Sequence, residues 1–142
     1  MILGNDIVHD IPPKAWATIT NKEVIAVDQD PLGIQGDKVR VYGEGVKLPR
    51  MGHPLPLGDI RDNNLEVWSK PLTGGLRAVG LFNKTKAPAS IIVDWTDIGL
   101  KSNQKAEVRD LWNHRDLGAF TGRYTATVEP HSLALVKVTP VQ

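Results

Sequence analysis

The sequence predicts a mainly β protein, an antiparallel β-sandwich preceded by one strand and one short helix of α/β type. From Val39 onward, short runs rich in β-branched and aromatic residues recur between glycine and proline turn signals, a spacing typical of a sandwich. Residues 1 to about 35 differ, because a continuous apolar run there is followed by helix signals. With 142 residues, of which 41% are hydrophobic, the chain can form one packed domain or two very small ones.

Composition narrows the functional classes. Lys and Arg number 17 and Asp and Glu number 16, which gives a net charge of +1. This balance disfavours nucleic acid and anionic membrane as partners. The chain has no cysteine, so it can form neither a disulfide framework nor a thiolate zinc site. We expect no membrane span, because no apolar run is long enough, and no secretory leader, because the start lacks a basic region and a long apolar core.

The first part of the chain predicts a buried strand and a helix. The run MILGNDIV at 1–8 is typical of a parallel strand that is buried on both faces. The proline pair at 12–13 can open a short helix, and Thr20 with Glu23 three residues later has the pattern of a capping box. Pro31 ends the helix. A single parallel strand lacks ladder partners, so we expect the chain to begin in the middle of a fold.

The segment DQDPLGIQG at 28–36 has two interpretations. Its two aspartates, with Gly33 at the sixth position, could begin a calcium-binding loop. However, Leu32 occupies the fifth position, and Val39 stands at the twelfth, where the closing glutamate is required. The spacing therefore favours the end of a helix and a hinge.

The second part, residues 36–142, predicts the sandwich. The interval from 43 to 64 carries several prolines and glycines and predicts a loop. Seven or eight short strands are expected in two sheets. The runs that predict them are VRVYG at 39–43, LEVWSKPL at 65–72, LRAVGLFN at 76–83, SIIVDW at 90–95, AEVRDLW at 106–112, RYTATV at 123–128 and LALVKV at 133–138.

Five segments together resemble the glycoside hydrolase family 27 α-galactosidases, or melibiases, in their C-terminal portion. The resemblance implies that residues 1–35 form the last strand and helix of a (β/α)8 catalytic barrel. It also implies that residues 36–142 form a C-terminal antiparallel β-sandwich of Greek-key-like topology. The segments are GNDI at 4–7, NKEVIAVDQDPLGIQG at 21–36, LEVWSKPL at 65–72, WTDIGL at 95–100 and VRDLWNHRDLGAFTG at 108–122.

The same resemblance implies that the chemistry lies elsewhere. Family members use two aspartates on earlier barrel strands for retaining hydrolysis of terminal α-galactosides, and neither segment has a match here. We therefore expect no catalytic residue, no cofactor and no metal, and an accessory or scaffold domain that is inactive alone. The expected partner is a catalytic barrel or a second copy of the chain. The alternatives are a carbohydrate-binding module that takes galactosyl sugars, and a small independent enzyme with a repurposed site.

Alternation along 65–70 indicates a candidate binding face. Leu65 and Val67 lie on one side of the strand, whereas Glu66, Trp68 and Lys70 lie on the other. A tryptophan between charged neighbours is unusual for a core residue, so it can meet a neighbouring domain, be partly buried, or stack on a sugar. Of these, contact with a neighbouring domain is favoured.

Other residues have structural interpretations. Trp95 and Trp112 are expected in the core, because Trp95 shares an apolar side with Ile91 and Val93, and Trp112 shares a side with Val108, although Asp110 lies there too. Asp6 stands at the end of the predicted first strand, where a turn or cap role is favoured over chemistry. The four histidines have no metal-ligand spacing. Asn83 begins an N-K-T sequon, which would matter only in a eukaryotic secretory pathway.

Overall fold

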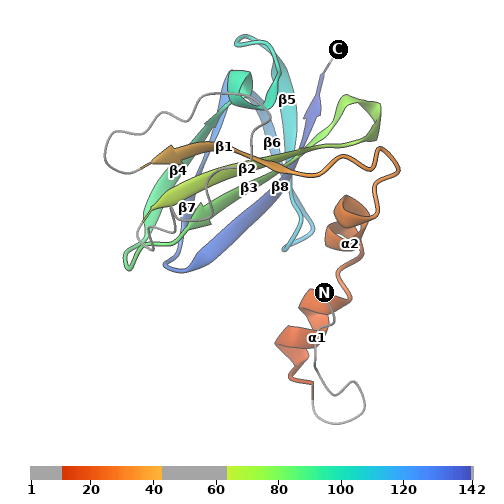
Figure 1. Cartoon of the computed structure of the whole chain (residues 1–142), viewed down its shortest axis with the longest axis vertical. Helices are drawn as coiled ribbons and strands as arrows, with labels where there is room; N and C mark the ends of the chain where they lie inside the picture. Colours follow the sequence, from red (N-terminus) through yellow and green to blue (C-terminus); the bar gives the residue numbers. More distant parts are fainter. Residues whose placement is uncertain (1–10, 43–63, 142) are drawn as a thin grey trace.

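The computed structural model describes residues 11–42 and 64–141 (Figure 1). The strand predicted at 1–8, with Asp6, and nearly all of the loop predicted at 43–64 lie outside the described residues. Within them, two short helices are followed by eight strands in two sheets. No helix in the described part is long and apolar enough to cross a bilayer.

The helical signals form two helices, α1 (Pro13–Ile19) and α2 (Lys22–Asp28). The predicted capping box on Thr20 is wrong by one residue. The Thr20 hydroxyl donates to the Trp16 carbonyl at 2.8 Å, so it closes α1. Asn21 caps α2 instead, because its side-chain oxygen accepts from the amides of Glu23 at 3.0 Å and Val24 at 3.2 Å.

Helix α2 ends before Pro31, as the sequence predicts. Helix α2 ends at Asp28, and residues 29–36, here called the strap, lead to the first strand. The Asp30 carboxylate accepts from the Leu32 amide at 3.0 Å, and from the Thr73 amide and hydroxyl at 3.0 Å each. Asp30 therefore fastens the strap to the turn between two later strands. Among the described residues, no group of three or more His, Cys, Asp or Glu side chains could hold a metal ion.

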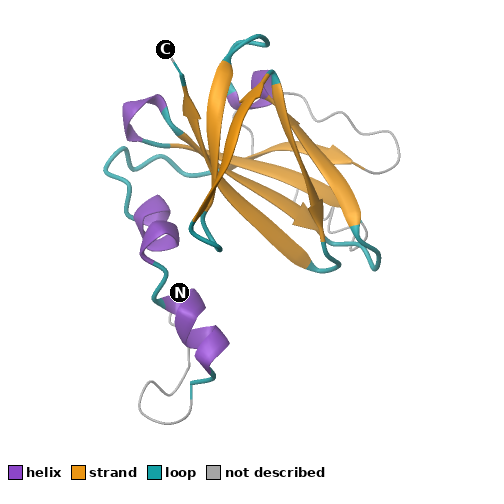
Figure 2. Ribbon diagram, turned by 180° about the vertical axis from the view of Figure 1, so that it is seen from behind, coloured by secondary structure: helices purple, strands orange, loops and turns teal. Residues whose placement is uncertain are grey.

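The strands form a sandwich (Figure 2). The larger sheet has the order β1-β2-β3-β8-β5-β6 and the smaller one pairs β4 with β7; every pairing is antiparallel. Strand β8, the last in sequence, lies between β3 and β5, and the chain crosses between the sheets, which agrees with the Greek-key-like prediction. The bounds are β1 Asp37–Tyr42, β2 Leu65–Pro71, β3 Arg77–Asn83, β4 Ala89–Asp94, β5 Lys105–Asp110, β6 Arg115–Thr121, β7 Arg123–Val128 and β8 Ser132–Pro140.

The core lies between the two sheets. Trp95 is fully buried in it, which confirms the prediction. Trp112 is only half-buried, and the neighbouring Leu111 takes the buried position at 1% exposure. The reason is a turn, because the Asp110 carboxylate accepts from the amides of Trp112 at 2.9 Å and Asn113 at 3.1 Å. The main core residues are Val67, Val79, Leu81, Ile91, Val93, Trp95, Val108, Val136 and Val138.

A bulge in β1 sends two nearby cations to opposite sides of the large sheet. The register shifts between Lys38 and Arg40, so that Lys38 pairs with Trp68 and Arg40 with Val67. Arg40 consequently reaches the carboxylates of Asp94 at 2.9 Å and Asp97 at 2.8 Å, near the small sheet. Lys38 is left on the outer face.

Candidate interaction face on the large sheet

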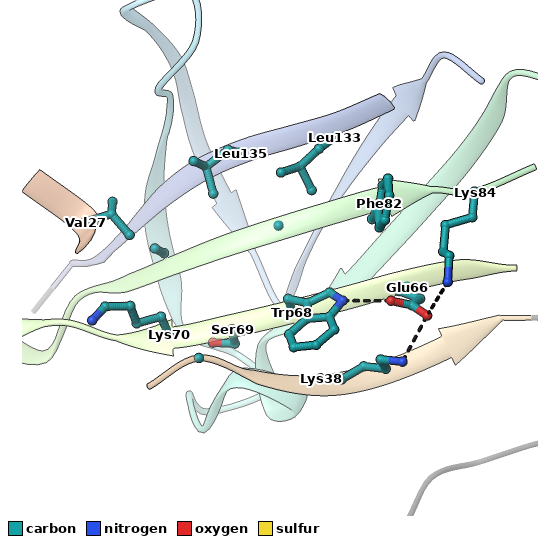
Figure 3. Close-up of a pocket in the computed structure, with 13 residues that line it drawn as sticks. Val27, Lys38, Glu66, Trp68, Ser69, Lys70, Phe82, Lys84, Leu133 and Leu135 are labelled. Carbon is teal, nitrogen blue, oxygen red and sulfur yellow. Dashed lines mark hydrogen bonds and ion pairs between the residues drawn. The ribbon is translucent and has the colours of Figure 1, made fainter. Parts of the chain in front are cut away.

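The outer face of the large sheet, turned away from β4 and β7, contains a groove (Figure 3). The groove has a volume of about 510 Å³ and is here called the outer groove. Its floor comes from β2, β3 and β8, one edge comes from β1, and Val27 of α2 lies at one end. The residues that line it include Lys38, Glu66, Trp68, Lys70, Gly80, Phe82, Lys84, Leu133 and Leu135.

Cross-strand register builds the floor. Trp68 lies opposite Gly80, and Gly80 lies opposite Leu135. A Cβ at Gly80 would come within 3.2 Å of the Leu133 side chain and 3.8 Å of the Trp68 Cβ. The glycine therefore leaves room for the two large side chains on neighbouring strands to approach each other. The result is an apolar depression between an indole and two leucines.

Glu66, which shares its side of β2 with Trp68 and Lys70, is a buried carboxylate. Only 3% of it is accessible. It accepts from the Trp68 indole nitrogen at 2.9 Å, from the Lys38 ammonium at 2.9 Å and from the Lys84 ammonium at 3.5 Å. Burial alone would raise the pKa of Glu66, but the hydrogen bonds from Lys38 and Trp68 outweigh it and hold the pKa below its ordinary value. The Glu66 carboxylate is therefore ionised and holds three donors at the groove edge.

Trp68 is 39% exposed within this arrangement. The Lys38 ammonium lies 5.3 Å from the centre of the indole ring, in a cation–π geometry. One ring face is thus already occupied. Lys70 also lines the groove, but its ammonium donates to the Ile34 carbonyl of the strap at 2.9 Å. The structure therefore brings all three predicted residues to one groove, with Glu66 and Trp68 in direct contact and Lys70 turned toward the strap.

Helix α2 is fastened to the same sheet by polar contacts. The Asn21 amide donates to the buried Leu111 carbonyl at 2.9 Å. The Glu23 carboxylate accepts from the Arg109 guanidinium at 2.7 and 2.8 Å, and the His114 ring nitrogen Nδ1 lies 2.8 Å from it. Hydrogen bonding from Arg109, followed by that from His114, lowers the pKa of Glu23 to about 2. Sequence reasoning found none of these contacts, since the partners lie 86 to 91 residues apart.

Seven large apolar side chains of the described residues are exposed. Within 11–42 and 64–141, four large ones belong to the helices and the strap, and two belong to the outer groove. A seventh, Val141, lies near the end of the chain. The six are Trp16, Ile25, Leu32 and Ile34, and Trp68 and Leu133.

The sequon asparagine has a structural role. Asn83 is fully buried, and its amide donates to the carbonyls of Ala87 and Val128 at 2.8 Å each. Its oxygen accepts from the Thr85 amide at 2.9 Å and hydroxyl at 2.7 Å. With both ends of the side chain bonded in the interior, Asn83 cannot accept a glycan in the folded protein.

Fold and site together define an antiparallel β-sandwich domain that carries an incoming helical segment on the outer face of its large sheet. The family model for the alpha galactosidase C-terminal beta sandwich domain matches residues 62–138. The chain belongs to this family and corresponds to the C-terminal portion of glycoside hydrolase family 27 α-galactosidases.

Individual relatives and solved structures agree with this family assignment. The chain is 34% identical over 142 residues to a probable alpha-galactosidase of Dictyostelium discoideum, covering 99% of this chain and 32% of the relative. It is 36% identical to alpha-galactosidase 3 of Arabidopsis thaliana, covering 99% and 28%. The crystal structure of alpha-galactosidase I from Mortierella vinacea superposes with a TM-score of 0.79 at 29% identity, covering 97% and 31%. The chain thus spans about a third of the length of these proteins.

Proposed function

We propose that this chain is the accessory domain that supports the catalytic (β/α)8 barrel of a retaining α-galactosidase, and that the outer groove faces that barrel. In this proposal residues 1–35 belong to the end of the barrel and residues 36–142 to the sandwich. The observation that carries it is the position of α2. The helix that precedes the sandwich is fastened to the outer face of the large sheet, and its Val27 closes one end of the groove.

The composition of the groove supports a domain interface. Interfaces within one chain are partly polar, and aromatic residues are enriched at interface cores. An indole buries up to about 250 Å², so covering the exposed 39% of Trp68 removes on the order of 100 Å² from water. At about 25 cal/mol per Å², this stabilises docking by roughly 2.5 kcal/mol.

The chemistry of the groove supports a scaffold role for this chain. Retaining glycosidases use two carboxyl groups about 5 Å apart, one as nucleophile and one as acid and base. Among the described residues, Glu66 is the one carboxylate that lines the outer groove, and its oxygens accept from three donors. In our proposal the barrel supplies the catalytic pair, and the isolated chain does not hydrolyse a chromogenic α-galactoside.

A chimera tests the proposal. The matching C-terminal third of the Dictyostelium relative is replaced by this chain, and hydrolysis of a chromogenic α-galactoside and thermal unfolding are measured. We expect an active chimera. Trp68→Ala should lower its melting temperature while leaving the isolated chain nearly unchanged, and Thr125→Ala, on the exposed side of β7, should affect neither.

Two results contradict docking through the groove. One is an inactive or insoluble chimera, because a supporting domain of this family should replace its equivalent. The other is an equal effect of Trp68→Ala in the chimera and in the isolated chain, because the indole would then act only within the sandwich.

The half-exposed indole favours one alternative, a carbohydrate-binding module. A sugar platform needs a free aromatic face, and Lys38 occupies one face of Trp68. Titration of the isolated chain with galactose, followed by tryptophan fluorescence, separates the two functions. Quenching that Trp68→Ala abolishes would replace the docking proposal with sugar binding.

A further inference from the structure

We propose that the surface that fills the outer groove is acidic and amphipathic, presenting an apolar side chain flanked by at least one Asp or Glu. This inference rests on the proposed docking of a barrel and specifies the chemistry of that barrel's contact surface. It follows from the floor of the groove, from the charges at its edge and from the helix already present at one end.

The floor selects an apolar side chain. Gly80 and Phe82 of β3 and Leu133 and Leu135 of β8 line it without a charged group. Leu133 and Trp68 are each 39% exposed beside it. A polar partner surface would gain little from covering these two side chains. An apolar side chain of the partner would instead remove their apolar area from water, which stabilises docking.

The edge selects a carboxylate. Three lysines, Lys38, Lys70 and Lys84, line the groove with one carboxylate, Glu66, so the lining carries a net charge of +2 (three positive, one negative). The whole chain has a net charge of only +1. The outer groove thus carries an excess of positive charge beside its exposed apolar side chains.

Docking makes this imbalance costly. Lys38 and Lys84 are already only 16% and 21% exposed, and both ammonium groups contact the same Glu66 oxygen, at 2.9 and 3.5 Å. An apolar partner that covered them would remove two cations from water against one anion. Each ammonium has three donors, so a carboxylate on the partner can accept from those that Glu66 does not use and restore the balance.

The position of α2 at the end of the groove also supports a barrel surface as the partner. Val27 of α2 lines one end of the groove (Figure 3), so a helix already borders the groove there. A barrel surface continuous with α2 would extend along the floor toward Lys38 and Lys84. The apolar contact then lies over Gly80, and the carboxylate over the two ammonium groups.

Three synthetic amphipathic peptides test the inference on the full chain. One carries a leucine face flanked by glutamates, the second replaces each glutamate with lysine, and the third keeps the glutamates but replaces each leucine with serine. The reporter is the indole N–H resonance of Trp68, assigned with Trp68→Phe. We expect the first peptide to shift this resonance and to bind more weakly at higher salt. The other two peptides should bind at least tenfold more weakly, a difference of about 1.4 kcal/mol in binding free energy.

A matched pair of variants locates the charge effect. Lys84→Met should weaken binding of the glutamate peptide by about three- to tenfold, because one partly buried ion pair is lost. Lys86→Met, in the exposed turn that follows β3, should leave it unchanged. Equal losses in both variants would show non-specific attraction and overturn the inference.

Two further results overturn it. If the lysine peptide binds as tightly as the glutamate peptide, the groove does not select carboxylates. A second result is that no peptide shifts the Trp68 resonance, while the chimera is active and sensitive to Trp68→Ala. The barrel then docks through the outer groove, but its contact surface is not acidic. If the chimera also fails, the proposed function itself is wrong.

Discussion

Replacing Asn21 should release α2 from the sandwich, because this one side chain both caps the helix and ties it to the sheet. The residue is 5% exposed. Loss of an N-cap costs about 1 kcal/mol. Loss of the buried bond to the Leu111 carbonyl costs about 1 kcal/mol more, and the orphaned carbonyl adds roughly as much again. Asn21→Ala should therefore destabilise the docked helix by about 2 to 3 kcal/mol.

Amide exchange measures this release directly. The amides of Ile25 and Gln29 are bonded within the helical segment, to the carbonyls of Asn21 and Ile25, each at 2.9 Å. Their protection should fall by about 30- to 150-fold in Asn21→Ala, at tenfold per 1.4 kcal/mol. Asn21→Ser keeps a capping oxygen but cannot reach the Leu111 carbonyl, so its loss should be intermediate. A loss below about threefold in Asn21→Ala, or equal losses in both variants, would refute the double role.

Three further predictions concern separate sites. Asn83→Ala should lower the free energy of unfolding by about 3 kcal/mol in urea, because the buried Val128 carbonyl loses its donor and the Thr85 amide and hydroxyl lose their acceptor, whereas the exposed Asn103→Ala should change it little. The folded pKa of Glu23, about 2, lies below its ordinary value of 4.5, so its ion pair with Arg109 contributes fully above about pH 4.5 and is lost as the pH falls toward 2. The protection factors of the α2 amides, which are corrected for the intrinsic exchange rate at each pH, should therefore fall in that window, and Glu23→Gln should remove this fall. Trp68→Ala should reduce any self-association of the isolated chain in analytical ultracentrifugation, and an unchanged association constant would show that dimers form elsewhere.

The sequence predicts most of the sandwich because alternation within a strand is a local signal. Two-residue periodicity alone placed Trp95 in the core, where the structure buries it fully. Strand β6 was not among the predicted runs, since Gly118 within it suggested a turn. In the structure Gly118 adopts a φ of 99° and β6 passes through it beside the bulge of β5. A turn signal inside a strand cannot be recognised without its partner strand.

The candidate site was predictable only in part. Alternation placed Glu66, Trp68 and Lys70 on one face, and all three line the outer groove. The burial of Glu66 was not predictable, because it depends on Lys38 and Lys84, which lie 28 and 18 residues away. The bulge in β1 that turns Lys38 outward has no evident sequence signal. Local patterns thus indicate a face, but long-range pairing sets its charge and shape.

The strap limits the distance between α2 and the first strand of the sandwich. Asp30 holds the turn at Thr73, and the Ile34 carbonyl holds Lys70, so the eight residues 29–36 are pinned at two points along their length. An insertion between the pins would have to bulge into solvent or break one of them, whereas the exposed turn at 101–103 offers no such constraint. Exchange of this domain between related enzymes should therefore succeed with a junction before Asn21. A junction at residue 36 would separate the strap from both of its anchors and discard the spacing that they fix.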